Sequence, residues 1–160
     1  MTTQLVIIGA GPGGHAAAFR AADLGLAVTV VDAEERPGGV CLLRGCIPSK
    51  AFLHAAKVIR EADDAKLCGL DFAAPAVDLD RLRAWKQEVV TKLTDGVAFR
   101  FKQGKVRHLR GRARFVGPNT LRIGDDQELP FDNCIIATGS QAIMPPFVPR
   151  EAARVMGSRE

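Results

Sequence analysis

Two cysteines, Cys41 and Cys46, are the residues of this sequence best suited to chemistry. A C-x-x-x-x-C spacing is not typical of a zinc site, and no second ligand pair accompanies it. A plant-type iron–sulfur pattern would need a further closely spaced cysteine, which the sequence lacks. A disulfide across so small a loop would stabilise the fold by only about 2 kcal/mol, so redox chemistry is the better interpretation.

The residues around this pair favour a reactive thiol. Pro48 suits the first turn of a helix, and a helix N-terminus stabilises the thiolate of a nearby cysteine such as Cys46. Arg44 between the cysteines and Lys50 after them would add positive potential if their side chains point inward. Two ordinary buried thiols remain the alternative on spacing alone.

A second candidate site is the stretch Gly9-Ala10-Gly11-Pro12-Gly13-Gly14, which fits the pattern G-x-G-x-x-G. It follows a short apolar run and opens an alanine-rich segment, and Asp32 lies 18 positions after Gly14. Gly9 would permit a tight turn, Gly11 a close approach to pyrophosphate, and Gly14 close helix packing. Asp32 would accept hydrogen bonds from a ribose diol and repel a 2′-phosphate. A dinucleotide site is therefore preferred over a glycine turn that binds nothing.

The segments that would position these residues alternate between strands and helices. We predict buried parallel strands at 5–8 and 28–31 with a helix over 12–24 between them, forming a right-handed βαβ unit. Further helices are predicted from about 48 to 66 and from about 80 to 102. Short strands after residue 105 would lead to a buried strand at 134–137. The stripes expected to be buried are Leu53, Ala56, Ile59 and Ala62 on the first of these helices, and Leu82, Val89, Leu93 and Val97 on the second.

Together these residues resemble the pyridine-nucleotide–disulfide oxidoreductase family, and within it the dihydrolipoamide dehydrogenases. The stretch from Gly38 to Lys50 is similar to the active-disulfide signature, and its Ile47-Pro48-Ser49-Lys50 end leans towards the lipoamide enzymes. The glycine motif, Trp85-Lys86, Gly117-Pro118-Asn119 and Ala137-Thr138-Gly139-Ser140 also occur in the family's order. The resemblance implies an α/β chain with a Rossmann-like, three-layer FAD-binding fold and an inserted β-meander.

The resemblance also implies roles for individual residues. Cys41 would exchange with a dithiol substrate, Cys46 would lie beside the isoalloxazine, and Lys50 would approach flavin N5. No metal ligand is predicted. Leu43 and Arg44 stand where the family more often has Asn-Val, which leaves the electrostatics on the substrate side open. The residues expected to contact FAD are Gly9, Gly11, Gly14, Asp32, Ala33, Gly39, Val40, Cys41, Lys50, Ala113, Thr138 and Gly139.

The activity implied for the complete protein is oxidation of dihydrolipoamide to lipoamide with NAD as acceptor. The implied partners are the lipoyl-bearing acyltransferase of 2-oxo acid dehydrogenase complexes and a second copy in a homodimer, and the expected location is the cytoplasm. Residues 1–145 are assigned to the FAD-binding domain and 146–160 to the start of a connection to an NAD-binding domain. Because no second G-x-G-x-x-G appears, the NAD site is expected to be absent from this chain, which alone is expected to be inactive.

Composition argues against other classes of protein. A net charge of +4 with both signs interspersed gives no reason to expect nucleic acid, and the apolar stretch at 4–19 is too short for a membrane span. Arg110, Arg112 and Arg114 alternate with smaller or apolar residues, which is typical of a strand with one solvated and one packed face. The alternatives left open are a mercuric or glutathione reductase-like flavoenzyme, and a truncated nucleotide-binding or redox module without turnover.

Overall fold

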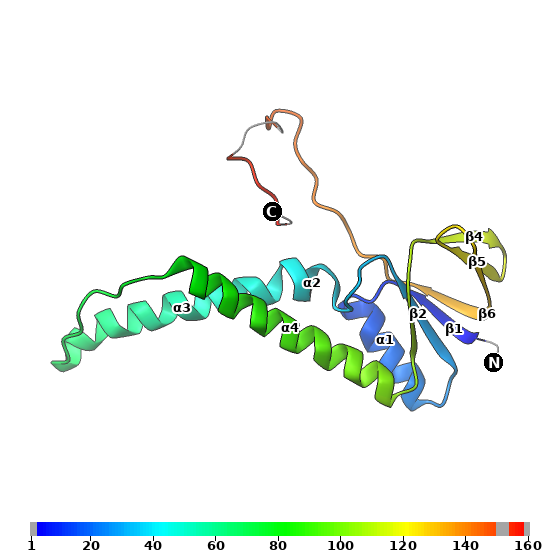
Figure 1. Cartoon of the computed structure of the whole chain (residues 1–160), viewed down its shortest axis with the longest axis horizontal. Coiled ribbons are helices and arrows are strands. Elements are labelled where there is room, and N and C mark those ends of the chain that lie inside the picture. Colours follow the sequence, from blue (N-terminus) through cyan, green and yellow to red (C-terminus); the bar gives the residue numbers. More distant parts are fainter. Residues whose placement is uncertain (1–2, 150–153, 159–160) are drawn as a thin grey trace.

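The computed structural model describes residues 3–149 and 154–158 and has alternating strands and helices (Figure 1). The strands form one sheet in the order β3-β2-β1-β6-β5-β4. The elements are β1 (Thr3–Ile8), α1 (Pro12–Asp23), β2 (Val28–Asp32), α2 (Gly39–Arg44), α3 (Cys46–Asp64), the 3-10 helix η1 (Ala65–Cys68), α4 (Leu79–Gln103), β3 (Arg107–Arg110), β4 (Ala113–Gly117), β5 (Thr120–Ile123) and β6 (Gln127–Ile136).

The sheet has a parallel half and an antiparallel half that share β6. Strands β3, β2, β1 and the second part of β6 are parallel, so their carboxyl ends meet at one edge. The first part of β6 pairs antiparallel with β5, which pairs antiparallel with β4. These last three segments are the inserted meander that the sequence predicts.

Apolar side chains alternate between the two faces of the parallel strands. Leu5 and Ile7 face α1 and α4, where they pack in one cluster with Ala18 and Phe101. Val6 faces the meander and packs in a second cluster whose other buried members are Val31, Leu121, Ile123, Leu129 and Phe131. Helices, parallel sheet and meander therefore form three layers, and the predicted α/β fold class is confirmed.

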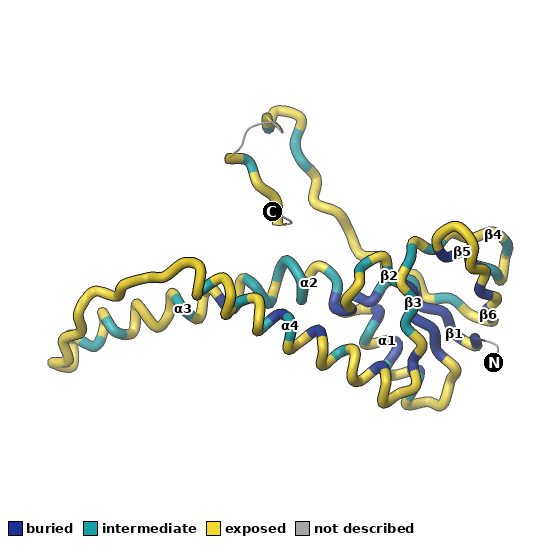
Figure 2. The backbone as a smooth tube through the Cα atoms, viewed as in Figure 1, coloured by how far each residue is buried: buried dark blue, intermediate teal, exposed yellow. Residues whose placement is uncertain are grey.

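Helices α3 and α4 project away from the sheet as a long hairpin, most of which is exposed (Figures 1 and 2). The predicted buried stripe of α3 is wrong, since Leu53 is 67% exposed and Ala56 and Ile59 are exposed as well. The two helices pack on each other, and no other described element covers the outer side of α3. On α4 the buried residues are Val90, Thr94 and Phe101, whereas Leu93 of the predicted stripe is exposed and Leu82, Val89 and Val97 are half-buried.

The predicted buried strand at 134–137 is also only partly right. Cys134 packs against the meander cluster, but Ile136 is 66% exposed because no described element covers this end of β6. Phe115 on β4 is exposed too, so the predicted packed face of that strand stops at Ala113. From residue 137 to 149 the chain has no helix or strand and runs away from the sheet (Figure 1).

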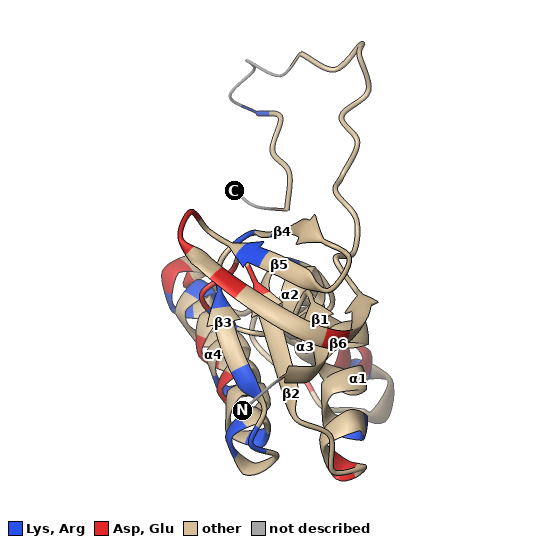
Figure 3. Cartoon of the chain, turned by 90° about the vertical axis from the view of Figure 1, so that its right-hand side faces the viewer, with Lys and Arg blue, Asp and Glu red and all other residues tan. Residues whose placement is uncertain are grey.

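Charged residues of both signs are spread over the strands and helices seen from the sheet side (Figure 3). Within the described residues, no helix combines the length and the apolar character that crossing a membrane requires. The division of the chain at residue 145 remains a prediction.

Candidate functional site

The glycine motif forms the turn between β1 and α1. Gly9 has φ +105°, and a Cβ there would overlap the carbonyl oxygen of Ala137, while a Cβ on Gly14 would overlap the carbonyl oxygen of Gly9. A Cβ on Gly13 would meet nothing within 4 Å. Helix α1 begins without a side-chain cap, so the N–H groups of its first turn are open to an anion. The turn is thus packed on one side and open on the side where pyrophosphate would bind.

Asp32 ends β2 at the same edge of the sheet. The backbone N–H of Ala10 donates to Asp32 Oδ2 at 2.5 Å, and the N–H of Glu34 donates to Oδ1 at 2.8 Å. Each carboxylate oxygen keeps a further lone pair for a ribose hydroxyl. The N–H of Gly111 donates to the Asp32 carbonyl at 2.8 Å, which brings Ala113, two residues further on, to this end of the edge.

The loop after Asp32 returns to the glycine turn. The N–H of Gly38 donates to the carbonyl of Ala10 at 2.9 Å, and a Cβ on Gly39 would lie 2.6 Å from the Cα of Gly11. Both Gly38 (φ +130°) and Gly39 (φ +61°) have backbone conformations that favour glycine. The start of α2 therefore lies directly against the glycine turn, whereas Ala33 and Val40 on either side of this contact are exposed.

Cys41 in α2 and Cys46 at the start of α3 form a disulfide with their Cα atoms 4.7 Å apart. Gly45 is the single residue between the two helices, and it ends α2 and precedes α3. Helix α3 begins at Cys46, two residues before its predicted start, and α2 was not predicted. Cys46 is exposed, Cys41 is half-buried, and Lys50 is exposed one turn into α3.

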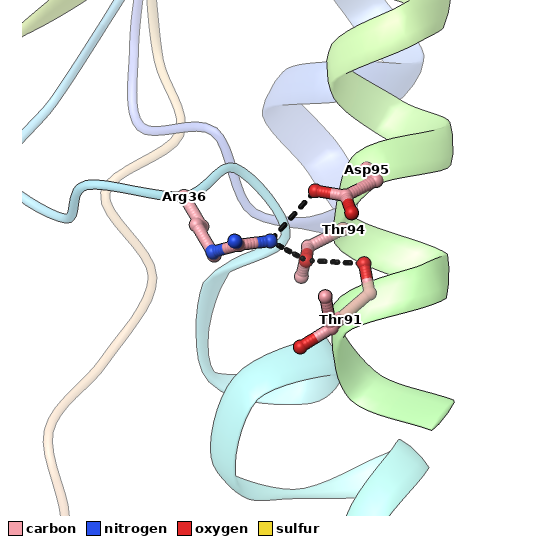
Figure 4. Close-up of polar contacts among 4 residues, drawn as sticks. All are labelled: Arg36, Thr91, Thr94 and Asp95. Atoms are coloured by element: carbon pink, nitrogen blue, oxygen red, sulfur yellow. Dashed lines mark hydrogen bonds and ion pairs between the residues drawn. The ribbon is translucent and has the colours of Figure 1, made fainter. Parts of the chain in front are cut away.

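Two ion pairs hold the loop between Asp32 and Gly38. Arg44 Nη2 lies 2.6 Å from Glu34 Oε1, and Arg36 Nη1 lies 2.6 Å from Asp95 Oδ1 on α4. Arg36 also donates to the hydroxyl of the buried Thr94 at 3.4 Å (Figure 4). Sequence reasoning missed these partners, since the pairs join residues 10 and 59 positions apart and no local pattern marks them.

Thr138 and Gly139 follow β6 at the same edge. The N–H of Ala137 donates to the carbonyl of Ile8 at 2.8 Å, so the chain leaving β6 passes beside the glycine turn. Both residues are exposed, and Gly139 has φ +70°. Apart from Lys50, which lies one turn into α3, the predicted contacts come from five separate segments that reach one edge of the sheet, with the disulfide next to it. Among the residues described, no group of three His, Cys, Asp or Glu side chains could hold a metal ion.

His108 and Cys134 lie on strands of the parallel sheet, and each has a pKa shifted from its usual value. His108 on β3 lies in register with Val30, its ring is 5.7 Å from that of Phe101, and its buried Nε2 has no partner among the described residues. Burial lowers the pKa of His108, and the nearby Asp32 carboxylate offsets part of this change. Burial raises the pKa of the Cys134 thiol, which favours its unreactive form.

This fold and site define a class of protein. The family model described as pyridine nucleotide-disulphide oxidoreductase matches residues 3–158, and the chain belongs to this family. Membership implies a flavin cofactor.

Curated relatives of the chain include dihydrolipoyl dehydrogenases. The one from Haemophilus influenzae is 48% identical over 162 residues, which cover 99% of this chain and 34% of that protein. The one from Vibrio cholerae is 45% identical over 160 residues, covering 98% of this chain and 34% of that protein. The chain spans about a third of the length of the curated relatives it matches.

A solved structure has the same fold. The HOCl-induced flavoprotein disulfide reductase RclA from Escherichia coli superposes with a TM-score of 0.73 at 28% identity. The match covers 89% of this chain and 29% of that chain. Its name agrees with a flavin and a disulfide on this fold.

Proposed function

We propose that this chain is the FAD-binding, disulfide-bearing part of a dihydrolipoyl dehydrogenase. The observation that carries the proposal is the contact of Gly39 with Gly11, which puts the Cys41–Cys46 segment directly beside the dinucleotide turn. One edge of the sheet thereby offers a place for a pyrophosphate and a pair of sulfurs that can be oxidised and reduced.

The residues at this edge fit FAD. The glycine turn and the uncapped first turn of α1 would hold the pyrophosphate, and Asp32 would accept hydrogen bonds from the adenosine ribose. Ala33, Ala113, Thr138 and Gly139 lie where they would border the rest of the cofactor. When bound, the flavin supplies the transfer of two electrons between the cysteine pair and a pyridine nucleotide.

The cysteines themselves perform thiol–disulfide exchange. A thiolate of the dihydrolipoyl group attacks Sγ of Cys41, and Cys46 leaves as a thiolate. The second thiolate of the dihydrolipoyl group then attacks the substrate sulfur of the mixed disulfide, and Cys41 leaves as a thiolate, so two electrons pass to the cysteine pair while the two protons of the substrate thiols go to solvent. Cys46 begins the long helix α3, where the helix dipole stabilises the leaving thiolate, and Lys50 one turn later adds positive charge.

The remaining assignments of the complete protein follow from its relatives. NAD is the proposed acceptor, a lipoyl-bearing acyltransferase the proposed partner, a homodimer the proposed assembly, and the cytoplasm the proposed location. The names of the curated relatives favour this function over a mercuric or glutathione reductase-like activity.

The protein made from its complete natural reading frame should reduce lipoamide with NADH. Cys41→Ser and Cys46→Ser should each lower kcat/KM at least about a thousandfold, because each removes one sulfur of the exchanging pair. Cys68→Ser, at an exposed free cysteine, should leave the rate unchanged. Lipoamide reduction that persists without Cys41 would contradict the proposal. So would an unaltered protein that reduces glutathione disulfide faster than lipoamide.

The 160-residue chain should not turn over by itself, because it spans only about a third of the length of the dihydrolipoyl dehydrogenases that it matches. A sample that stayed yellow after gel filtration and reduced lipoamide with NADH would overturn this part of the assignment.

A further inference from the structure

A continuous set of polar contacts joins Asp32, whose carboxylate is proposed to bind the ribose, to the segment that carries the disulfide. The carboxylate of Asp32 accepts from the backbone N–H of Glu34 at 2.8 Å, which fixes the start of the loop. The carboxylate of Glu34 then pairs with Arg44 at 2.6 Å. Arg44 lies between the two bonded cysteines, so the contacts lead from one end of the proposed cofactor site to the other.

The Glu34–Arg44 pair is better shielded from water than the other ion pairs between described residues. The Arg44 and Glu34 side chains are 21% and 39% exposed. In every other ion pair between described residues, both side chains are more than 45% exposed. An ion pair that is partly removed from solvent is less screened and holds its geometry more firmly than one at the surface.

The place where this pair acts is the junction of the two helices that carry the sulfurs. Arg44 is the last residue of α2 and Cys46 the first of α3, with only Gly45 between them. Glycine restricts the backbone least, so a contact from outside the junction helps to keep one arrangement when the disulfide opens. The guanidinium of Arg44, held by Glu34, supplies that contact.

We propose that Glu34 is a positioning residue, which acts through Arg44 to hold Cys41 and Cys46 at bonding separation and so favours the disulfide over the dithiol. The inference rests on the proposed function, since it assigns a role within the same redox pair. Holding two reacting groups together raises their effective concentration, and here that stabilises the bonded state. Loss of the tether makes the disulfide easier to reduce.

The test uses the full chain, Met1 to Glu160, equilibrated with mixtures of reduced and oxidised dithiothreitol. In this exchange the protein disulfide takes two electrons and two protons from the dithiol reagent, which becomes a cyclic disulfide. Acid quenching, alkylation and mass spectrometry count the two forms without any need for flavin. Glu34→Gln and Arg44→Gln should each shift the equilibrium towards the dithiol by about fivefold to tenfold, where tenfold corresponds to about 30 mV.

The coupling between the two residues is the readout that a general structural role would not give. The double variant E34Q/R44Q should shift the equilibrium no further than either single variant, because both remove the same contact. Arg44→Lys keeps a positive charge within reach of Glu34. Its shift towards the dithiol should therefore be at most half that of Arg44→Gln on a logarithmic scale.

Arg36→Gln is the matched control. It breaks the other ion pair of the same loop, of the same 2.6 Å length, but that pair leads to α4 and not to the cysteines. Its equilibrium should stay within about twofold of the unaltered chain. If a glutamine variant loses its helical circular dichroism, Glu34→Asp and Arg44→Lys take its place, with a smaller shift expected in the same direction.

Folded Glu34→Gln and Arg44→Gln variants within twofold of the unaltered chain would overturn the inference, as would additive effects of the two or an equal shift in Arg36→Gln. If the disulfide is reversible but its equilibrium with the dithiol does not depend on Glu34 or Arg44, this inference alone is refuted. If Cys41 and Cys46 of the unaltered chain form no reversible disulfide, the proposed function fails as well.

Discussion

The sheet and the α3–α4 hairpin use the same kinds of apolar residue in different ways. In the sheet, Val6, Ile7 and Leu121 are fully buried between helices and meander, whereas Leu53 and Ile59 on the hairpin are exposed (Figure 2). Both regions have an apolar pattern that predicts burial, a continuous run in the strands and a helical period in the hairpin. Only the sheet finds covering surfaces among the described residues. An amphipathic pattern therefore indicates which face is apolar and does not reveal what covers it.

The candidate site lies at the boundary of these two regions. Its nucleotide end belongs to the sheet edge, where Asp32 and the glycine turn are fixed by backbone hydrogen bonds. Its disulfide lies at the first residues of the hairpin, where Cys46 begins α3. We infer that the sheet determines where a dinucleotide binds, and the loop between Asp32 and Gly38 determines where the sulfurs lie relative to it.

The largest expected effect distinguishes the two regions directly. Leu121→Ala should lower the free energy of unfolding by about 3 kcal/mol, because it leaves a cavity between the meander and the parallel strands. Leu53→Ala, the same substitution on the hairpin, should cost less than about 0.5 kcal/mol. Urea denaturation followed by circular dichroism measures both. Equal losses would show that the hairpin is as firmly packed as the sheet and would refute the comparison.

A second pair of substitutions tests the glycine turn within the sheet region. Gly14→Ala should cost about 2 kcal/mol, because its Cβ would overlap the carbonyl oxygen of Gly9 and force the helix away from the strand. Gly13→Ala, one residue earlier, meets nothing within 4 Å and should be neutral or slightly stabilising. The same denaturation experiment gives both values. A Gly14→Ala protein as stable as Gly13→Ala would mean that the turn is not packed as described.

How much of the structure could be predicted differs between the same two regions. The βαβ unit was predictable, because its strands are short apolar runs and its turn has glycines at fixed spacing. The disulfide followed from the resemblance of the segment around Cys41 and Cys46 to a known signature, since spacing alone left two ordinary thiols as an alternative. The exposure of Leu53 could not be predicted, since helical periodicity is the same whether or not another surface covers the face.

The polar contacts around the disulfide were the least predictable part of the site. Arg36 and Asp95 are 59 residues apart, and their contact depends on how α4 folds back beside the loop. The Glu34–Arg44 pair depends on the short helix α2, which is too brief to have a periodic pattern of its own. Such pairs depend on tertiary geometry, which a single sequence does not specify.

The smallest expected effect concerns pH and the edge of the sheet. Because burial lowers the pKa of His108, the folded state resists protonation more than the unfolded chain does. The stability due to neutral His108 is present above its unfolded pKa of 6.5 and is lost as the pH falls below that value. His108→Phe should therefore reduce the loss of unfolding free energy between about pH 7.5 and pH 5.5.

Urea denaturation at several pH values measures this difference between the unaltered chain and the variant. Leu53→Ala, on the exposed side of α3, removes no titratable group, serves as the control and should leave the pH dependence unchanged. An unchanged pH dependence in His108→Phe would mean that this imidazole is protonated as easily in the folded state as in the unfolded chain.

The central claim is that the disulfide and a bound flavin act as one redox unit, and an anaerobic reductive titration of the complete flavin-loaded protein tests it most directly. The unaltered protein should take up about four electrons per flavin, two for the ring and two for the disulfide. Cys46→Ser should take up about two. An uptake of about two electrons by both proteins would show that the sulfurs at 41 and 46 do not exchange electrons with the flavin, and it would contradict the account.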